Sequence, residues 1–121
     1  MQDHNTKIFV KFYIKTRRSG LLSAISDRDW KTLCVLATYM NQDGQCNPSQ
    51  ARLADDIGVS HTSAWDRVKS LSKFRLQGKP IIEIAEKKRT SSGRFASLNY
   101  RILPESGLAI FQFHKEVKVG Q

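Results

Sequence analysis

The chain has 121 residues, of which 40% are hydrophobic and 26% are charged. This composition excludes a disordered chain, and no apolar run approaches the roughly 20 residues that a membrane-spanning helix needs. The formal net charge of +9 points to a polyanionic partner such as nucleic acid, an acidic membrane surface or an acidic protein.

The first third of the chain predicts one strand and one helix. Residues 8–14 are β-branched and aromatic, which favours a strand, and residues 15–20 form a polar, basic break. Ser26 is expected to be an N-cap, because two carboxylates and then apolar residues at helical spacing follow it. We therefore predict a helix over residues 27–40.

The middle of the chain predicts two short helices with a tight turn between them. Ser49 is expected to cap the first helix, and Gly58 is expected to end it with a positive φ. Ser60 then begins a helix over residues 61–74. This spacing is typical of a helix-turn-helix.

The remainder of the chain predicts strands. Residues 81–85 and 97–102 have strand patterns, and the polar segment 86–94 between them is expected to be a basic hairpin tip. Residues 108–113 are predicted to form one more strand, paired either with residues 8–14 or with a second subunit.

Charge is distributed in blocks of one sign along the chain. The net charge is +4 over residues 1–25, −3 over 26–66, +8 over 67–101 and zero over the last twenty residues. A solvated surface without a target more often mixes its signs. The blocks therefore indicate a directed electrostatic field.

The helix-turn-helix segment resembles a known family. The motif runs through Gly44, Pro48-Ser49, Leu53-Ala54 and Gly58-Val59-Ser60. It is similar to the winged helix-turn-helix domain of bacterial, plasmid and phage proteins, found in replication initiators of mobile elements and in small transcriptional regulators. The resemblance extends from Arg18 to Tyr100, and it implies DNA binding.

The fold that this resemblance implies is α+β and mainly α, with a three-helix core and a β-hairpin wing. We expect residues 1–121 to form a single domain with its core at residues 20–103. A basic N-terminal strand or arm is expected at residues 1–19, and a C-terminal strand is expected at residues 104–121.

The resemblance also implies which residues bind DNA. The first motif helix would touch the DNA backbone, the second would enter the major groove, and the wing would contact phosphates or the minor groove. Four cations on one hairpin tip repel one another, and helix dipoles do not explain them. The expected DNA-binding residues are Ser49, Gln50, Ser60, His61, Thr62, Ser63, Trp65, Arg67, Lys69, Lys87, Lys88, Arg89 and Arg94.

Two residues of the second motif helix depart from the family pattern. Asp66 either accepts a hydrogen bond from a cytosine amino group or forms an ion pair or cap within the domain. Trp65 either completes the core or contacts the groove. Ser49 is explained equally well as a helix cap alone, and the cations late in this helix also suit its dipole.

No catalytic pattern is present. The three histidines are far apart in sequence, the carboxylates are scattered, and the two cysteines form neither a CxxC motif nor a metal-binding spacing. We therefore predict a cytoplasmic, non-enzymatic protein without a metal, a cofactor, a small-molecule substrate or a membrane partner.

The preferred interpretation is a sequence-preferring, double-stranded DNA-binding protein that regulates transcription of a bacterial or mobile-element gene set. One alternative is the origin-binding domain of a plasmid or phage replication initiator, in which case the chain would be a fragment of a longer protein. The other is a protein-docking winged helix that recruits a partner or forms a homodimer through its terminal strands.

Overall fold

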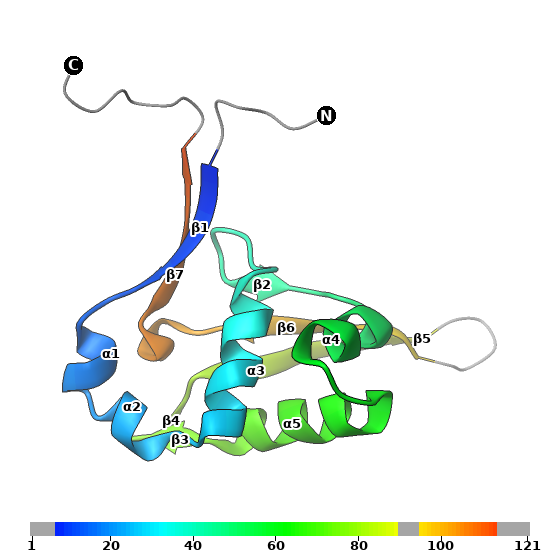
Figure 1. Ribbon diagram of the computed structural model, residues 1–121, viewed down its shortest axis with the longest axis horizontal. Helices are drawn as coiled ribbons and strands as arrows, with labels where there is room; N and C mark the ends of the chain where they lie inside the picture. The colour runs from blue at the N-terminus through cyan, green and yellow to red at the C-terminus, as the bar shows by residue number, and fades with distance from the viewer. Residues whose placement is uncertain (1–6, 90–94, 114–121) are drawn as a thin grey trace.

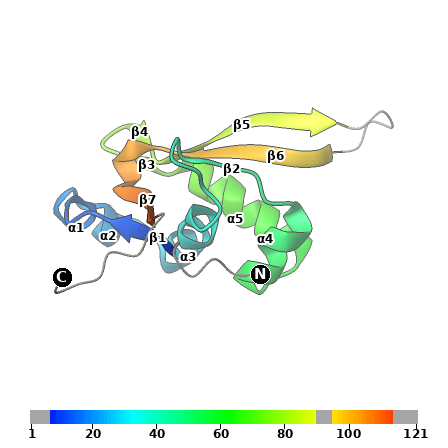
Figure 2. The same ribbon diagram turned by 90° about the horizontal axis from the view of Figure 1, so that it is seen from above.

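The protein is built from a layer of helices beside a small antiparallel sheet. The computed structural model describes residues 7–89 and 95–113, with side chains described for residues 7–84 and 99–111. Helices α3, α4 and α5 lie on one side of the sheet formed by β2, β6 and β5 (Figures 1 and 2). The elements are β1 (Lys7–Phe12), α1 (Lys15–Arg18), α2 (Leu21–Ala24), α3 (Asp27–Ala37), β2 (Gln45–Cys46), α4 (Gln50–Ile57), α5 (His61–Lys73), β3 (Arg75–Leu76), β4 (Lys79–Pro80), β5 (Ile82–Arg89), β6 (Phe95–Ile102), a 3₁₀ turn (Pro104–Ser106) and β7 (Leu108–Phe113).

Serine hydroxyls begin the three longer helices, which confirms the predicted caps. The bonds, each 3.1 Å long, run from the backbone N–H groups of Asp29, Arg52 and Ser63 to the Oγ atoms of Ser26, Ser49 and Ser60. Each bond satisfies a first-turn N–H that has no partner within its helix. Gly58 ends α4 with a φ of 88°, as expected.

The helix predicted over residues 27–40 is shorter than expected. It ends at Ala37, and the N–H groups of Thr38, Tyr39 and Met40 each donate to a carbonyl three residues earlier. These tighter bonds close the helix end. Met40 is nevertheless buried. It fits the apolar pattern because its side chain packs into the core, although its backbone is not part of the helix.

The core lies between the helix layer and the sheet. Its fully buried aliphatic side chains include Leu33, Leu36, Leu53, Val68, Leu71 and Ile81. Burial of one such side chain is worth roughly 1.5–3 kcal/mol. The core therefore depends on one apolar face from each of the three helices, as the spacing predicts.

The predicted hairpin is present, and its strands are longer than expected. β5 and β6 pair from Ile82 opposite Ile102 to Arg89 opposite Phe95. Residues 86–89, which were expected in the hairpin tip, therefore continue β5. Strands pair through their backbone groups whatever the polarity of their side chains. The side-chain pattern therefore predicted an end of the strand that was too early. The rest of the predicted tip, residues 90–94, lies outside the described residues.

The segment expected as a polar break, residues 15–20, contains the helical turn α1. Thr16 is buried within it and donates its hydroxyl to the carbonyl of Ser106 at 3.3 Å. This contact joins residues 90 positions apart, and local periodicity contains no signal for it. The prediction of a simple break was therefore wrong.

Residues 77–80 form the turn and second strand of a small hairpin. β3 and β4 pair across Gln77 and Gly78, whose φ values are 53° and 83°. Two successive positive φ values are those of a tight hairpin turn that matches strand twist. The short strands lacked a readable alternating pattern.

β1 and β7 form a two-stranded ribbon that extends away from α5 (Figure 1). They are antiparallel, from Lys7 opposite Phe113 to Phe12 opposite Leu108. Of the two pairings that the sequence left open for residues 108–113, the structure therefore has the one within the chain. The first strand ends at Phe12 rather than residue 14.

Gly44 is required where the turn before β2 meets β6. Its carbonyl accepts a 2.8 Å hydrogen bond from the N–H of Ile102. Its φ is +82°, and a Cβ at this position would collide with the carbonyl oxygen of Ile102. Both backbone conformation and space therefore favour glycine.

We predict that Gly44→Ala lowers the free energy of unfolding by about 3 kcal/mol or more, because it adds a backbone collision to the cost of positive φ. Gly78→Ala is the matched control, since Gly78 has a φ of +83° and open space around it. It should cost about 1 kcal/mol. Urea denaturation of both variants tests this difference, and equal losses would contradict it.

Two groups in the sheet are held in their neutral forms. Burial raises the pKa of the Cys46 thiol to about 12 and that of Tyr100 to about 12. A hydrogen bond from Gln50 opposes the shift of Tyr100. Burial also raises the pKa of the half-buried Cys34, for which a smaller part of the side chain is enclosed.

We predict that stability falls as pH rises from about 9 to 12. Below pH 9 the Cys46 thiol is protonated in both states; above it, the unfolded chain loses the proton first, so alkali favours unfolding. Cys46→Ala should make the decline with pH less steep, by at most about 1.4 kcal/mol per pH unit. Cys34→Ala is the control and should change the slope less. Urea denaturation at a series of pH values measures this, and an unchanged slope in Cys46→Ala would contradict it.

Candidate nucleic-acid interface

α4 and α5 meet in a tight turn around Gly58. The N–H groups of Gly58 and Val59 both donate to the carbonyl of Ala54, at 2.8 and 3.0 Å. Ala54 and Ala64 are buried, one on each helix, and their small side chains let the two helices approach closely. The sequence predicted this helix-turn-helix geometry correctly.

The N-termini of α4 and α5 carry unbalanced positive helix dipoles. Neither helix has an acidic residue in its first turn, whereas the first turn of α3 contains Asp27 and Asp29. A helix N-terminus without its own carboxylate attracts external anions. Ser49 and Ser60 stand at these two starts and are exposed.

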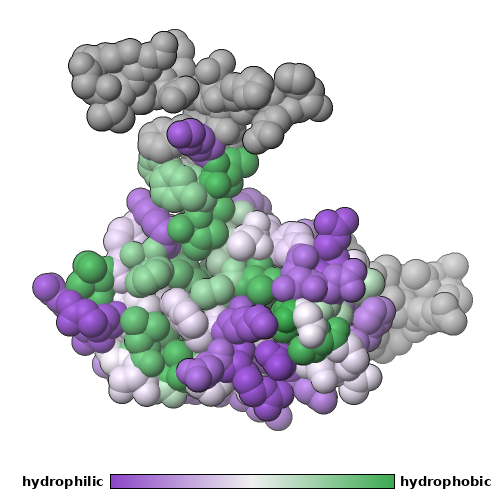
Figure 3. Space-filling view, viewed as in Figure 1, coloured by the Kyte–Doolittle hydropathy of each residue, from purple (hydrophilic) through white to green (hydrophobic). Residues whose placement is uncertain are grey.

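The outer face of α5 is polar. Ala64, Val68 and Leu71 turn inward and are buried. The exposed residues of the helix are His61, Thr62, Asp66, Lys69, Ser70 and Lys73, while Ser63 and Trp65 are half-buried. The expected groove-facing residues His61, Thr62 and Lys69 therefore lie on one accessible helix, and hydrophilic residues cover this side of the molecule in Figure 3.

Asp66 and Trp65 are both in contact with Lys69. The Lys69 ammonium lies 3.5 Å from Asp66 Oδ1 and 5.5 Å from the centroid of the Trp65 ring. Trp65 also packs against the core with another part of its surface. Asp66 thus forms the ion pair within the domain that was one of its two expected roles, and Trp65 bridges the core and the outer face.

Arg67 faces α3 rather than the outer face. It is half-buried and lines a small pocket of about 70 Å³ with Ser26, Arg28, Asp29 and Ser70. Asp29 is buried there and accepts hydrogen bonds from the Ser70 hydroxyl at 3.1 and 3.3 Å. The sequence had no signal for this cluster, because its members come from two helices 41 residues apart.

Gln50 connects the start of α4 to the sheet. Its Nε2 donates a 2.5 Å hydrogen bond to the hydroxyl of Tyr100 on β6. The side chain is half-buried. This expected DNA contact therefore holds the N-terminus of α4 against the base of the wing.

The wing cations are only partly within the described residues. The backbone of Lys87, Lys88 and Arg89 belongs to β5, paired with β6. Arg94 lies outside the described residues. The cations of α1, Lys15, Arg17 and Arg18, are exposed at the other end of the helix layer from the wing (Figure 1).

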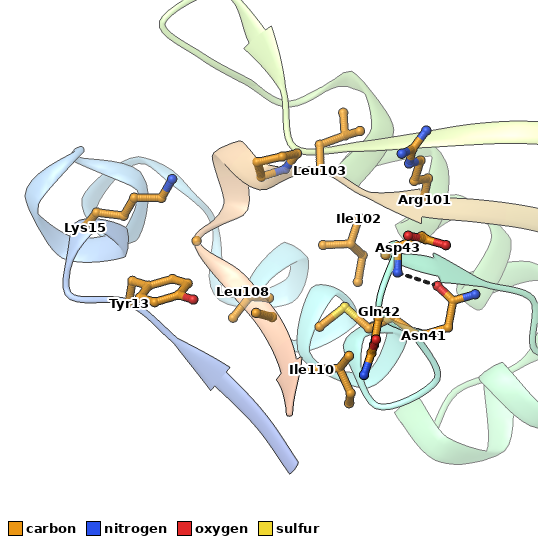
Figure 4. A pocket seen from close by; sticks show the side chains of 15 residues that line it. Tyr13, Lys15, Asn41, Gln42, Asp43, Arg101, Ile102, Leu103, Leu108 and Ile110 are labelled. Carbon is orange, nitrogen blue, oxygen red and sulfur yellow. Dashed lines mark hydrogen bonds between the residues drawn. The ribbon is translucent and has the colours of Figure 1, made fainter. Parts of the chain in front are cut away.

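A cleft of about 320 Å³ lies at the foot of the ribbon. Leu108 and Ile110 line it between Tyr13 on one side and the turn at Asn41–Asp43 on the other (Figure 4). Its lining has one carboxylate, that of Asp43, and no histidine or cysteine. Within residues 7–89 and 95–113, no group of three potential metal ligands was found.

Comparison with known proteins identifies the central segment. Residues 24–76 match the family model of a helix-turn-helix domain. No significant match was found among curated proteins or among solved structures. No helix in the described part of the chain is long and apolar enough to cross a membrane.

The matched segment spans α3, α4 and α5, and the β5–β6 hairpin follows it after the short strand β4. A domain of this kind suggests DNA binding. Residues 24–76 are thus similar to a helix-turn-helix domain, consistent with those of bacteria and mobile elements, and together with the hairpin their arrangement is compatible with a winged helix-turn-helix.

Proposed function

We propose that the protein binds double-stranded DNA with a sequence preference and regulates transcription of a bacterial or mobile-element gene set. It acts by binding alone, in the cytoplasm, as one domain over residues 1–121. α5 enters the major groove, and the wing lies on the backbone or in the minor groove.

The observation that carries this proposal is the pair of helix N-termini at α4 and α5. Both are capped by serine and neither has a first-turn carboxylate, so each offers N–H groups and a positive dipole to a phosphate. Ser49 and Ser60 would position the protein on the backbone in this way.

Base recognition is assigned to the start of α5. His61, Thr62 and Ser63 carry donors and acceptors in its first turn, the part of a recognition helix that reaches base edges. Trp65 and Lys69 follow on the same helix. Arg67 is given a positioning role, because it is half-buried and lines the small pocket with Asp29 and Ser70.

Phosphate contacts are assigned mainly to the wing, through Lys87, Lys88, Arg89 and Arg94. The ion pair between Asp66 and Lys69 neutralises one of the three cations of α5, so the wing cations would supply a large share of the electrostatic attraction. The block of residues 67–101, with a net charge of +8, contains these wing cations.

A replication initiator would use the same interface at an origin. Selection from a random pool gives the preferred DNA sequence, and the places where that sequence occurs in the source DNA distinguish the two roles: repeated sites indicate an origin, and a site at a promoter indicates an operator. A docking module, in contrast, would not need the wing cations.

The experiment is fluorescence anisotropy of a labelled duplex titrated with the protein over a series of salt concentrations. We expect log affinity to fall with log salt with a slope of about −4, which corresponds to four or more neutralised phosphates. The double variant Lys88→Ala, Arg89→Ala should weaken binding to all sequences and make the slope less negative by about 2.

The matched control is Arg28→Ala with Lys31→Ala, which removes one arginine and one lysine from exposed positions on α3. This variant loses the same amount of charge as the wing variant, but away from the proposed interface. Its slope of log affinity against log salt should therefore stay within about 0.5 of that of the parent. No binding by the folded parent at low salt would refute DNA binding, and equal losses in both double variants would refute a role for the wing.

We further predict that Asp66→Asn increases affinity for a random duplex by about threefold, because it releases Lys69 from its ion pair. Asp55→Asn makes the same charge change at an exposed position on α4 and is the control. Anisotropy at one salt concentration measures both. A loss of affinity in Asp66→Asn, with Asp55→Asn unchanged, would contradict this prediction.

A further inference from the structure

The β1–β7 ribbon exposes an unusual amount of apolar surface. Five of the six exposed large hydrophobic side chains in the described part of the chain lie in and just after β1. They are Ile8 (61% exposed), Phe9 (42%), Phe12 (55%), Tyr13 (50%) and Ile14 (59%). Figure 3 shows hydrophobic residues on the ribbon where it rises from the body. Exposed apolar side chains gathered along one strand in this way mark an interaction surface.

Within the described part of the chain, the ribbon has an unpaired strand edge. There, β1 and β7 form a two-stranded sheet, which is marginal in water without further strands or packing. β7 is the inner strand, because it contacts α3 and Leu108 on it is buried; Ile110 of β7 and Val10 of β1 both pack against the core. β1 is the outer strand, and its free edge presents backbone N–H and C=O groups to a further strand.

We propose that β1 pairs with β1 of a second copy of this chain. The two strands run antiparallel around a two-fold axis at Val10, and the ribbons join into a four-stranded sheet of order β7-β1-β1-β7. The partner is a second copy because, of the registers centred on Phe9, Val10 and Lys11 in the middle of β1, one avoids repulsion between like charges.

A two-fold axis perpendicular to the sheet keeps each side chain on the same face of the sheet. Residues directly opposite each other also share a face, so at the axis one residue must lie opposite its own copy. With the axis at Phe9, Lys7 would lie opposite Lys11 of the second copy. With the axis at Lys11, the two copies of Lys11 would oppose each other. Like charges directly opposite each other destabilise a strand pair.

The axis at Val10 avoids both repulsions. It places Lys11 opposite Phe9 of the second copy, Lys7 opposite Tyr13, and Ile8 opposite Phe12. Lysine already packs against aromatic rings on this face, because the Lys11 ammonium lies 5.2 Å from the centroids of both Tyr13 and Phe111. Such pairs are attractive when they are sheltered from water.

This pairing leaves α5 accessible in both copies, since the ribbon extends away from that helix (Figures 1 and 2). It does not depend on DNA, so its test is separate from that of the proposed function. If both hold, two copies would recognise a two-fold symmetric pair of half-sites.

The first test compares Phe9→Lys with Phe9→Glu. Both variants lose the ring contact between Phe9 and Phe111, whose centroids are 5.1 Å apart, so both should lose similar stability within the chain. Phe9→Lys places two lysines opposite each other twice in the proposed dimer, whereas Phe9→Glu places a carboxylate opposite Lys11. Thermal unfolding confirms that both variants are folded.

Sedimentation velocity over a micromolar concentration series gives the result. We expect the parent chain and Phe9→Glu to have twice the monomer mass of 13.8 kDa, and Phe9→Lys to dissociate roughly tenfold or more easily. A parent that stays monomeric without DNA, or a dimer that Phe9→Lys leaves unchanged, overturns the proposal.

The second test reads the register by disulfide formation. Val10→Cys should cross-link to itself under mild oxidation, because Val10 faces its own copy across the axis. Ile8→Cys and Phe12→Cys should cross-link only when the two variants are mixed. The native Cys34 is half-buried and Cys46 is buried, and the parent chain serves as the background. Efficient cross-linking of Ile8→Cys alone, or none in any combination, overturns the pairing.

Discussion

The packing of α4 against α5 across the turn at Gly58 is the constraint from which the rest of the interface follows. Buried alanines bring the helices together, and two hydrogen bonds to the Ala54 carbonyl close the turn. Once this contact is made, the inward face of α5 is determined by Val68 and Leu71. The opposite, polar face and both serine-capped helix starts are then left for an external partner.

Side-chain hydrogen bonds extend this unit to its neighbours. Gln50 ties the start of α4 to Tyr100 of the wing strand, and the Tyr39 hydroxyl donates to Asp56 to tie α3 to α4. Helix and wing are therefore held in a defined relation before any partner binds, which lowers the entropic cost of binding. Gln50, which was expected to contact DNA, thus stabilises the packing of α4 against the sheet through its hydrogen bond to Tyr100.

The electrostatics of the molecule are less uniform than its net charge of +9 implies. Asp66 neutralises one of the three cations of α5, and Asp29 lines the small pocket with Arg67. α1 and the wing strand β5, both rich in basic residues, lie at opposite ends of the helix layer. Basic segments at both ends suit a division between backbone attraction there and base recognition by α5.

Local chemistry was sufficient to predict much of this protein. The caps at Ser26, Ser49 and Ser60, the stop at Gly58 and the strand at residues 108–113 all depend on contacts or patterns within a few residues. The sequence shows such signals because the interacting groups are close along the chain. A capping side chain lies within three residues of the N–H that it binds, and the residues of one helix face recur every three or four positions.

Tertiary structure alone decided the features that depend on distant segments. The sequence did not determine that β7 pairs with β1 of the same chain, that Thr16 is buried against Ser106, that Arg67 faces Asp29, or that Gln50 binds Tyr100. Each of these contacts joins residues separated by 38 to more than 90 positions, and their distance in space is set by how the whole core packs. Periodicity and capping carry no information about such distances, because many arrangements of the same helices and strands share the same local pattern.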